Sequence, residues 1–427
     1  MMPILRDPDG YTYMKEEVGG LVVGGFEPVA KPWVAPDRLP HPFEFALLEE
    51  DWDHFEILMD SAMHRVPALA HTGVKKFYNG PESFTPDNQF VLGEAPEVRN
   101  LFVAAGFNSV GIASAGGAGR ALAEWIVAGE PQSDLVGVDI RRFAPFNGNN
   151  HWLHDRVGEV LGLHYAIPWP NREFDSARPF RRSPVHALVA ARNACFGSRM
   201  GWERPNYFAP LGVDPRIEYS WGFQNWQPWV DAEQRATREA VALFDETSFG
   251  KLLVQGPDAE RLLQWLCTAD VAVPVGRTVY TGVLNSRGTY EADVTVTRLA
   301  DDEYLWVTSA GSPVRDRDWI RRHARGFAVE VTDVSGAYAV LGVMGPRSRD
   351  LLAGLTRADL TSFEFGSSNE IDLGYATARA TRLTYVGELG WELYVPAEFA
   401  VDAFESIERA GREHGLVHAG YYAINAL

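Results

Sequence analysis

The sequence predicts a multidomain α+β protein. Its 427 residues, of which 46% are hydrophobic, are enough for about two or three separate hydrophobic cores. The composition changes twice along the chain, and from residue 229 onward strand-like and helical patterns alternate with regular turns. We therefore expect three parts, which cover residues 1–136, 137–228 and 229–427.

The composition also limits the functions that the chain can have. A net charge of -18 repels a phosphate backbone, so we expect no nucleic-acid partner. No apolar run reaches the roughly 18 residues of a membrane helix, and the first residues, MMPILRDPDG, lack the pattern of a signal peptide. We expect a cytoplasmic protein with no membrane partner. Cys195 and Cys267 lie too far apart for a metal or redox motif, which predicts buried structural thiols.

The first part begins with two strand-like segments and a helix. Residues 11–27, YTYMKEEVGGLVVGGFE, indicate an antiparallel ribbon around a glycine pair, with no upstream element to pair with it. Residues 43–69 place apolar side chains at helical spacing, which predicts one helix over this range. The apolar positions are Phe43, Ala46, Leu47, Phe55, Leu58, Met59 and Met63.

A glycine-rich joint, GFNSVGIASAGGAGRALAEWIVAGE, covers residues 106–130 and follows the apolar stretch NLFVAAG. A strand that turns into a helix here offers free amides and a positive helix end to an anion. Alternatively, a stripe of small and apolar residues on the helix serves close packing. A dinucleotide fingerprint would need a third glycine and a later acidic residue, so the residues alone leave both interpretations open. The stripe consists of Ile112, Ala115, Gly116, Gly119, Leu122, Ala123 and Ile126.

The middle part is rich in proline, arginine and aromatic residues, as in YSWGFQNWQPW. Such a composition predicts a packed connecting subdomain rather than a flexible linker. The segment HWLHDRVGEVLGLHY carries His151, His154 and His164, but no nearby carboxylate or thiol completes a standard metal-ligand set. We expect no metal here, and histidines that lie on the surface or are hydrogen-bonded in the core.

Both ends of the chain lack features that normally close a fold. The last residues, HAGYYAINAL, indicate a helix with no glycine cap, no basic last turn and no following loop. Together with the uncovered ribbon near the start, this predicts a fragment that is truncated at both ends.

Several motifs together resemble one enzyme family. The stretch from FYNGPESFTPDN to AEWIVAGEP is similar to the C-terminal part of the flavin domain of D-amino-acid-oxidase-like enzymes, specifically dimethylglycine and sarcosine dehydrogenases. PWPNREF, RPFRRSP and NWQPWVDAE resemble the connecting region of that family. LFDETSFGKLLVQGPDAERLL, YTGVLNSRGTYEADVTV and YVGELGWELYV resemble the folate-binding domain of the aminomethyltransferase (T-protein) of the glycine cleavage system. The matches follow the family's order and cover essentially the whole chain.

The resemblance implies FAD as the cofactor of the first part. In the family the joint lies beside the flavin ring, where the positive helix start favours the electron density of the reduced ring. The GxGxxG segment and the flavin-linking histidine of the family are not in this sequence, which implies the substrate-facing half of a flavin domain. Tyr13 matches a tyrosine near the amine substrate, with an ordinary strand tyrosine as the alternative. The implied cofactor-binding residues are Gly106, Phe107, Asn108, Gly111 and Ile112.

The resemblance implies tetrahydrofolate as the cofactor of the third part. Asp293 stands in an alternating Val/Thr strand, where a carboxylate is unfavourable unless it faces solvent or a pocket. The T-protein likeness makes Asp293 the catalytic acid near the pterin, with Tyr280 in the same pocket. Tyr385 and Glu392 match positions that wall and hydrogen-bond the pterin, where the Glu392 carboxylate can accept two N–H bonds. A solvated β-hairpin with one buried tyrosine is the alternative for this last pair.

The activity that the family implies joins both sites. Oxidation of an N-methyl group of dimethylglycine, sarcosine or a similar small methylated amine gives an iminium, and tetrahydrofolate captures the one-carbon unit as 5,10-methylene-tetrahydrofolate. The electrons leave to an electron-transfer flavoprotein or to oxygen. Such a reaction belongs to one-carbon metabolism and glycine betaine catabolism. Two alternatives remain: a folate-dependent aminomethyltransferase without a redox role, and a noncatalytic regulatory subunit of the pyruvate dehydrogenase phosphatase type.

Overall fold

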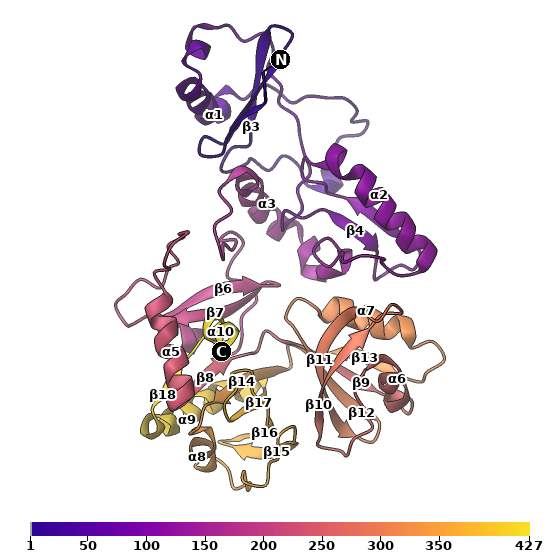
Figure 1. Cartoon of the computed structure of the whole chain (residues 1–427), viewed down its shortest axis with the longest axis vertical. Helices are drawn as coiled ribbons and strands as arrows, with labels where there is room; N and C mark the ends of the chain where they lie inside the picture. The colour runs from indigo at the N-terminus through magenta and orange to yellow at the C-terminus, as the bar shows by residue number, and fades with distance from the viewer. Residues whose placement is uncertain (1) are drawn as a thin grey trace. The chain divides into compact units, whose positions relative to one another are not determined.

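The computed structural model describes residues 2–427, which divide into two compact units (Figure 1). The first unit is Met1–Arg178 and the second is Pro179–Leu427. The division between them falls inside the expected connecting subdomain of residues 137–228. Both units combine helices and strands, so the prediction of a multidomain α+β protein is confirmed.

The first unit opens with a three-stranded antiparallel sheet of β1 (Leu5–Asp7), β2 (Thr12–Glu17) and β3 (Gly20–Gly25). The expected ribbon is present as β2 and β3, with Val18 and Gly19 at positive φ in the turn between them. The expectation that no upstream element pairs with it was wrong. Leu5 lies opposite Met14, because a tight turn that ends at Tyr11 (φ 56°) brings β1 back along β2.

The first long helix is shorter than the sequence predicted. We expected it over residues 43–69, but α1 covers Trp52–Arg65. The Asp51 side chain accepts a hydrogen bond from the backbone N–H of His54 at 3.0 Å, which satisfies a free amide of the first turn and begins the helix there. Phe45 has a φ of 50°, so the backbone before this cap is not helical.

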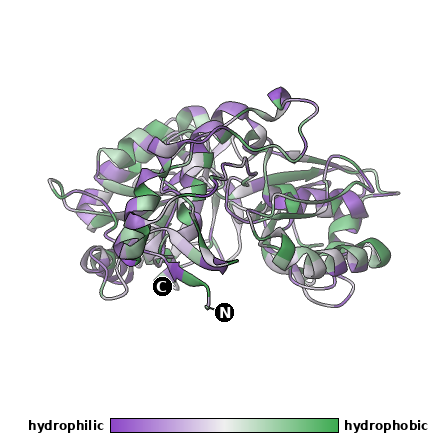
Figure 2. Cartoon of the chain, turned by 90° about the horizontal axis from the view of Figure 1, so that it is seen from above, coloured by the Kyte–Doolittle hydropathy of each residue, from purple (hydrophilic) through white to green (hydrophobic). Residues whose placement is uncertain are grey.

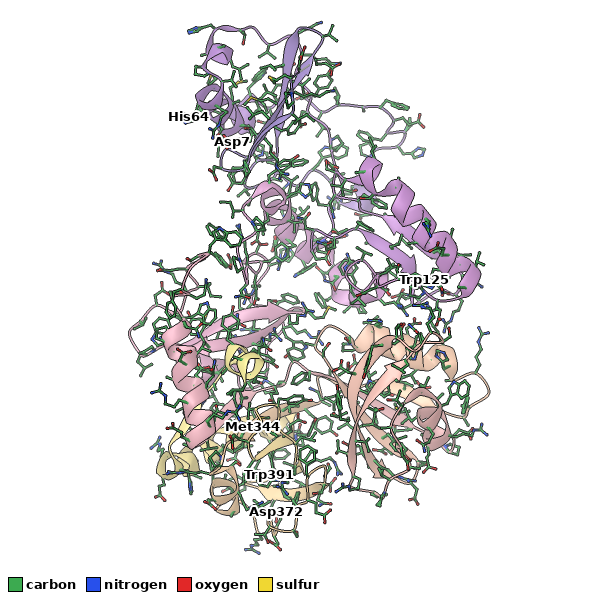
Figure 3. All side chains as sticks on the ribbon, in the orientation of Figure 1. Asp7, His64, Trp125, Met344, Asp372 and Trp391 are labelled. Carbon is green, nitrogen blue, oxygen red and sulfur yellow. The ribbon has the colours of Figure 1, made fainter. Side chains whose placement is uncertain are left out.

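The glycine-rich joint connects β5 (Phe102–Ala105) to α2 (Gly111–Ala128), and β5 pairs with β4 (Val91–Glu94). Trp125 is the main buried side chain of α2 and packs against Gly93 of β4 (Figure 3). The predicted stripe of small and apolar residues is exposed within this unit, apart from the half-buried Leu122. Close packing of the stripe is therefore not realised among the described residues of the first unit.

The last long helix of the first unit, α3 (Asn150–Tyr165), packs closely on the backbone near Pro28. A Cβ placed on Gly162 would lie 1.7 Å from the carbonyl oxygen of Pro28. A Gly162→Ala substitution is therefore expected to destabilise the first unit by about 3 kcal/mol, because backbone has to move to make room. The change is measured as a lower midpoint of urea or thermal unfolding.

Gly119→Ala in α2 is the matched control for this substitution. A Cβ at Gly119 meets no atom within 4 Å, so the variant should be as stable as the unaltered chain or more stable by up to about 1 kcal/mol. Equal unfolding midpoints for the Gly162 and Gly119 variants would contradict the tight contact at Pro28.

The second unit contains two large sheets and one hairpin. The five-stranded sheet has the order β10 (Thr278–Leu284), β11 (Tyr290–Ala300), β12 (Glu303–Thr308), β9 (Gly250–Gln255) and β13 (Glu330–Asp333). The six-stranded sheet has the order β15 (Ser368–Leu373), β16 (Ala376–Thr381), β17 (Gly390–Pro396), β14 (Tyr338–Met344), β8 (Val241–Asp245) and β18 (Leu416–His418). The hairpin pairs β6 (Ala194–Arg199) with β7 (Trp202–Phe208).

Helices cover one face of each large sheet in this unit. α6 (Ala259–Leu266) and α7 (Pro313–His323) pack on the five-stranded sheet, while α8 (Ser348–Ala353) and α9 (Ala400–Gly411) pack on the six-stranded sheet. The helices of the chain carry hydrophobic and hydrophilic segments on the same element (Figure 2), as one-sided burial requires. The remaining helices of the unit are α4 (His186–Ala190), α5 (Gln227–Glu239) and α10 (Tyr421–Ala426).

The other faces of the two sheets meet each other. Leu305 and Val307 of β12 form one small apolar cluster with Val340 of β14 and Tyr394 of β17. Successive strand residues point to opposite faces, so the residues that alternate with the helix-facing ones on each sheet point into this inter-sheet space. Polar side chains on these inner faces are therefore candidates for a site.

Candidate functional site

Two of the predicted site residues lie on the inner face of the five-stranded sheet. Val294 and Val296 of β11 belong to the helix-side core, so Asp293 between Ala292 and Val294 points the other way. In the antiparallel register Asp293 lies opposite Gly282, which places it diagonally from Tyr280 of β10. The Tyr280 hydroxyl donates to Oδ2 of Asp293 at 3.4 Å. Both side chains are exposed, and the pKa of Tyr280 is raised by partial desolvation of its hydroxyl and by the Asp293 charge.

The other two predicted residues come from the six-stranded sheet. Glu392 lies in β17, where Trp391 and Leu393 face the helices, so the Glu392 carboxyl group points into the inter-sheet space. Tyr385 lies on the connection between β16 and β17, stacks on Phe249 with ring centroids 6.0 Å apart, and is 42% exposed.

The structure brings these four residues together. Burial raises the pKa of Tyr385, and the charges of Glu392 and Asp293 raise it further, as does Tyr280. Phe249, on which Tyr385 stacks, packs against the apolar cluster between the two sheets, so Tyr385 also lies at the inter-sheet space. We call Tyr280, Asp293, Tyr385 and Glu392 the inter-sheet site. Its tyrosines and Asp293 are open to solvent, while Glu392 forms its buried part at 1% exposure.

The Glu392 carboxylate is held by its neighbour on the same strand face. The Tyr394 hydroxyl donates to Oε2 of Glu392 at 2.6 Å, a short hydrogen bond to a charged acceptor. Burial raises the pKa of Glu392 to about 7, although this hydrogen bond and the Lys251 ammonium group act to lower it. Glu392 therefore changes its charge close to neutral pH.

A Tyr394→Phe variant is expected to raise the pKa of Glu392 above 7, because the lost hydrogen bond stabilises only the ionised carboxylate. Infrared titration of the protonated carboxyl stretch measures the shift. Tyr304→Phe is the control, since Tyr304 is also fully buried but lies in the helix-side core of the other sheet. An unchanged titration in the Tyr394 variant would contradict the assigned hydrogen bond.

Two buried ionisable residues beside the inter-sheet site did not emerge from the sequence. Glu246 follows β8, is 0% exposed, and both of its carboxyl oxygens lack a hydrogen-bond partner. Lys251 in β9 is 0% exposed and donates from Nζ to the Thr247 carbonyl at 2.9 Å. The signal that could have found them is the presence of three charged residues, Asp245, Glu246 and Lys251, within the otherwise apolar and hydroxyl-bearing stretch LFDETSFGKLLV.

Glu246 and Lys251 both interact electrostatically with Glu392. Burial and then the charge of Glu392 raise the pKa of Glu246 well above its usual range. Burial lowers the pKa of Lys251 to about 7. The Glu246 carboxyl group lies over Gly342 of β14, because a Cβ on that glycine would come within 2.9 Å of it. Gly342 is also the register partner of Glu392, so the two acids share one small region of the sheet.

The inter-sheet site has the chemistry that a reduced pterin needs. The pyrimidine edge of a pterin offers N–H donors, for which the buried Glu392 supplies carboxylate acceptors. The aromatic faces of Tyr385 and Tyr280 suit a flat heterocycle, and the Asp293 carboxylate suits a cation that forms next to it. The residues present therefore fit tetrahydrofolate.

The predicted flavin-side residues gather at the joint in the first unit. Asn108 is buried, and its Oδ1 accepts a hydrogen bond from the Thr85 backbone N–H at 2.8 Å, so its side chain fixes the joint. Gly106 has a φ of 62° and lies against the Thr85 methyl group, a position that only glycine adopts without strain. Phe107 stacks on Phe90. The side chain of Asn108 is thus engaged within the protein, which leaves backbone groups for a ligand.

The beginning of α2 is the open side of this joint. Gly111 is the first helical residue, and Ile112 beside it is 101% exposed. No side-chain hydrogen bond caps this helix end. A positive helix end with exposed residues fits the edge of a flavin better than a packed core.

Tyr13 lines an open hollow of about 2900 Å³ in the first unit. Its hydroxyl lies over Gly24 of the neighbouring strand, and its ring stacks on Tyr165 with centroids 6.3 Å apart. Of the joint, only Ser109 reaches the hollow, so the structure does not bring Tyr13 together with the five predicted flavin-side residues. The guanidinium group of Arg6, which also lines the hollow, lies 4.3 Å from the centroid of the Tyr165 ring.

The three histidines of α3 have ordinary surroundings. His151 and His154 are exposed, and each lies within 4 Å of the Asp155 carboxylate. His164 is half-buried, contacts Asn88 at 3.2 Å, and packs edge-on against Phe26. Within residues 2–427 no cluster of three or more potential metal ligands is present. None of the helices described in this range has both the length and the apolar character for crossing a bilayer.

Comparison with protein families assigns three consecutive regions of the chain. Residues 1–125 match the FAD dependent oxidoreductase family, and residues 128–183 match the FAD dependent oxidoreductase central domain. Residues 185–427 match the GCVT N-terminal domain, which is more than half of the chain.

Curated relatives match the chain along its entire length. The 4-methylaminobutanoate oxidase (formaldehyde-forming) of Paenarthrobacter nicotinovorans is 42% identical, and the alignment covers 100% of this chain and 52% of that protein. Mitochondrial sarcosine dehydrogenase of Mus musculus is 36% identical, with 100% of this chain and 51% of that protein covered. The mitochondrial pyruvate dehydrogenase phosphatase regulatory subunit of Mus musculus is also 36% identical, with 100% and 49% covered. The chain thus spans about half the length of the curated relatives that it matches.

Proposed function

This chain belongs to the family of dimethylglycine and sarcosine dehydrogenases, FAD-dependent oxidoreductases with a GCVT-type domain, and on that premise we propose that it serves oxidative N-demethylation of a small methylated amino acid. The one-carbon unit is transferred to tetrahydrofolate as 5,10-methylene-tetrahydrofolate. The observation that supports this proposal most directly is the inter-sheet site, where four residues named from the sequence lie together between two sheets.

In this proposal the inter-sheet site binds the folate. Glu392 accepts hydrogen bonds from the pterin edge, while Tyr280 and Tyr385 enclose the ring. Asp293 is the catalytic residue, because its exposed carboxylate stabilises the cationic one-carbon carrier and takes up the proton that a folate nitrogen loses on attack. The burial of Glu392 suits recognition of the pterin, because a buried carboxylate is a fixed acceptor. The exposure of Asp293 suits transfer of the one-carbon unit, because the iminium has to reach this carboxylate.

The first unit serves the oxidation. FAD, when bound, supplies the two-electron chemistry, and Gly106, Phe107, Asn108, Gly111 and Ile112 form the joint that flanks it. Tyr13 orients the amine from the wall of the hollow and excludes water with its ring. We propose glycine betaine catabolism as the setting, a cytoplasmic location, and an electron-transfer flavoprotein as the partner that accepts the electrons, with oxygen as the alternative acceptor.

The name of one relative raises a second candidate function. The relative that is 42% identical is called formaldehyde-forming. The second candidate function is therefore oxidation of the amine with release of formaldehyde, without transfer of the one-carbon unit to folate. The presence of Asp293, Tyr280, Tyr385 and Glu392 at one site favours transfer in this chain. A pyruvate dehydrogenase phosphatase regulatory subunit is also among the relatives, but a noncatalytic role would not require the exposed carboxylate of Asp293 at the inter-sheet site.

Two measurements test the proposal. The purified protein is incubated with FAD and assayed for bleaching of flavin absorbance by sarcosine, dimethylglycine or 4-methylaminobutanoate, and separately titrated with tetrahydrofolate. We expect bleaching by one of the amines, and methylene-tetrahydrofolate as the product when folate is present. Folate binding with no flavin reduction would support an aminomethyltransferase instead. Flavin reduction with formaldehyde as the sole product, whether or not folate is present, would reject the transfer step.

A further inference from the structure

Glu246 has no structural partner that explains its burial. It is the only acidic residue among the described residues 2–427 whose fully buried side-chain oxygens lack a hydrogen-bond partner. An unpaired buried polar group costs about 1–3 kcal/mol, and a charged one costs more. An apolar residue at this position would stabilise the fold, so the carboxyl group is expected to serve a ligand.

The surroundings of Glu246 indicate which ligand it serves. It lies over Gly342, whose register partner across the sheet is Glu392, and the charge of Glu392 acts on it. Two carboxyl groups this close cannot both be ionised at low cost, so one of them holds a proton. The Glu392 carboxylate accepts a hydrogen bond from Tyr394 and is influenced by the Lys251 ammonium group, and both stabilise its negative charge. The pKa of Glu246 is raised by burial and by neighbouring acids, and neither a hydrogen-bond donor nor a cation lowers it. Glu246 is therefore the protonated member.

We propose that Glu246 is a further ligand-binding residue of the inter-sheet site, where its carboxyl group donates a hydrogen bond to the pterin edge beside Glu392. This inference rests on the proposed folate function. A carboxylic acid offers one donor and one acceptor, whereas a carboxylate offers acceptors alone. The pyrimidine edge of a pterin presents a carbonyl acceptor next to its N–H donors, so the acid pair matches it better than either acid does alone.

Tyr385 gives the ligand its access to both acids. Its ring is 42% exposed, and its hydroxyl is influenced by both Glu392 and Glu246. It is attached to the connection between β16 and β17 rather than to a strand. A pterin ring that stacks on the Tyr385 ring therefore lies beside the two carboxyl groups, both of which are buried.

The test compares Glu246→Gln with Glu246→Met by calorimetric titration with 5-formyl-tetrahydrofolate, a stable reduced folate. Glutamine keeps a donor and an acceptor and should bind within about threefold of the unaltered chain, whereas methionine has a similar length but no donor and should bind at least about tenfold more weakly. Thermal unfolding of the methionine variant should be unchanged or shifted upward, a result that a merely structural role would not give. Glu246→Leu provides a second apolar variant if the methionine variant does not fold.

Glu233→Gln is the matched control. Glu233 is also buried, but its oxygens accept from the Phe208 and Gly420 backbone N–H groups at 2.7 and 3.0 Å. This variant should keep its folate affinity. Binding by the apolar Glu246 variants within twofold of the unaltered chain would overturn the role of Glu246. Failure of the unaltered chain to bind the folate would instead reject the folate function itself, and with it the role of Glu246.

Discussion

An Asp293→Asn variant is expected to oxidise its amine at nearly the unaltered rate and to form about 10- to 100-fold less methylene-tetrahydrofolate. Asparagine keeps the shape of the side chain but removes the charge that stabilises the one-carbon cation. Two unit charges at about 4 Å interact with up to about 4 kcal/mol at an effective dielectric of about 20. Asp293 is exposed, so solvent screens part of this energy and the expected loss lies below that limit.

The measurement is a product balance in the flavin-loaded protein with tetrahydrofolate present. Formaldehyde should rise by the amount that methylene-tetrahydrofolate falls, because oxidation continues in the first unit. Thr295→Val, two residues further along β11, is a control on the same sheet face that changes no charge and should leave the product ratio as it was. Equal folate product from the Asp293 variant and the unaltered protein would remove Asp293 from the catalytic role.

A Glu392→Gln variant is expected to be more stable than the unaltered chain above pH 7 by about 3 kcal/mol, and equally stable near pH 4.5. The pKa of Glu392 is about 7 in the folded chain against an ordinary value of 4.5. Below pH 4.5 both states hold the proton, so no difference arises. As the pH rises from 4.5 to 7, only the unfolded state releases the proton, and the folded state loses stability that glutamine does not lose.

Chemical unfolding of both proteins between pH 4.5 and 8.5 tests this expectation. The lowered pKa of Lys251 imposes the opposite trend, with a cost to the folded state that grows as the pH falls from 10.5 to 7. The difference between the two proteins at each pH, rather than either profile alone, therefore reports on Glu392 and on the Glu246 carboxyl group that it influences. The same variant should bind 5-formyl-tetrahydrofolate at least about tenfold more weakly, because the amide replaces one of the two acceptor oxygens of the carboxylate with an N–H donor. Parallel pH profiles for the two proteins would contradict the assigned burial of an ionisable Glu392.

The strand pattern singled out Asp293 and predicted the direction of its side chain, while its proposed catalytic role came from the family resemblance. Asp293 interrupts a Val/Thr alternation, and the same alternation determines that it faces away from the helix-side core. The family resemblance supplied the other three residues, and the register of two sheets explains why they meet. A site of this kind depends on the pairing of strands that lie far apart in the chain, and the hydrophobic periodicity of each strand does not reveal its partner.

The features that escaped prediction all depend on tertiary contacts. The α1 helix begins at Trp52 rather than near Phe43, since the Asp51 cap outweighs the apolar spacing before it. Glu246 drew no attention because a charge at the end of a strand is usually solvated, and only the fold shows that it is buried. The hollow around Tyr13 is likewise lined by residues from several separate segments.

Gly342 has a consequence for how this protein can evolve. The space above this residue is what admits the Glu246 carboxyl group, and a single methyl group there would come within 2.9 Å of it. A one-codon change to alanine would therefore expel or tilt the acid while leaving the strand pairing of β14 intact. If Glu246 has the role that we propose, a change at Gly342 would weaken folate binding without unfolding the chain, so binding of the cofactor and stability of the fold can change independently at this position.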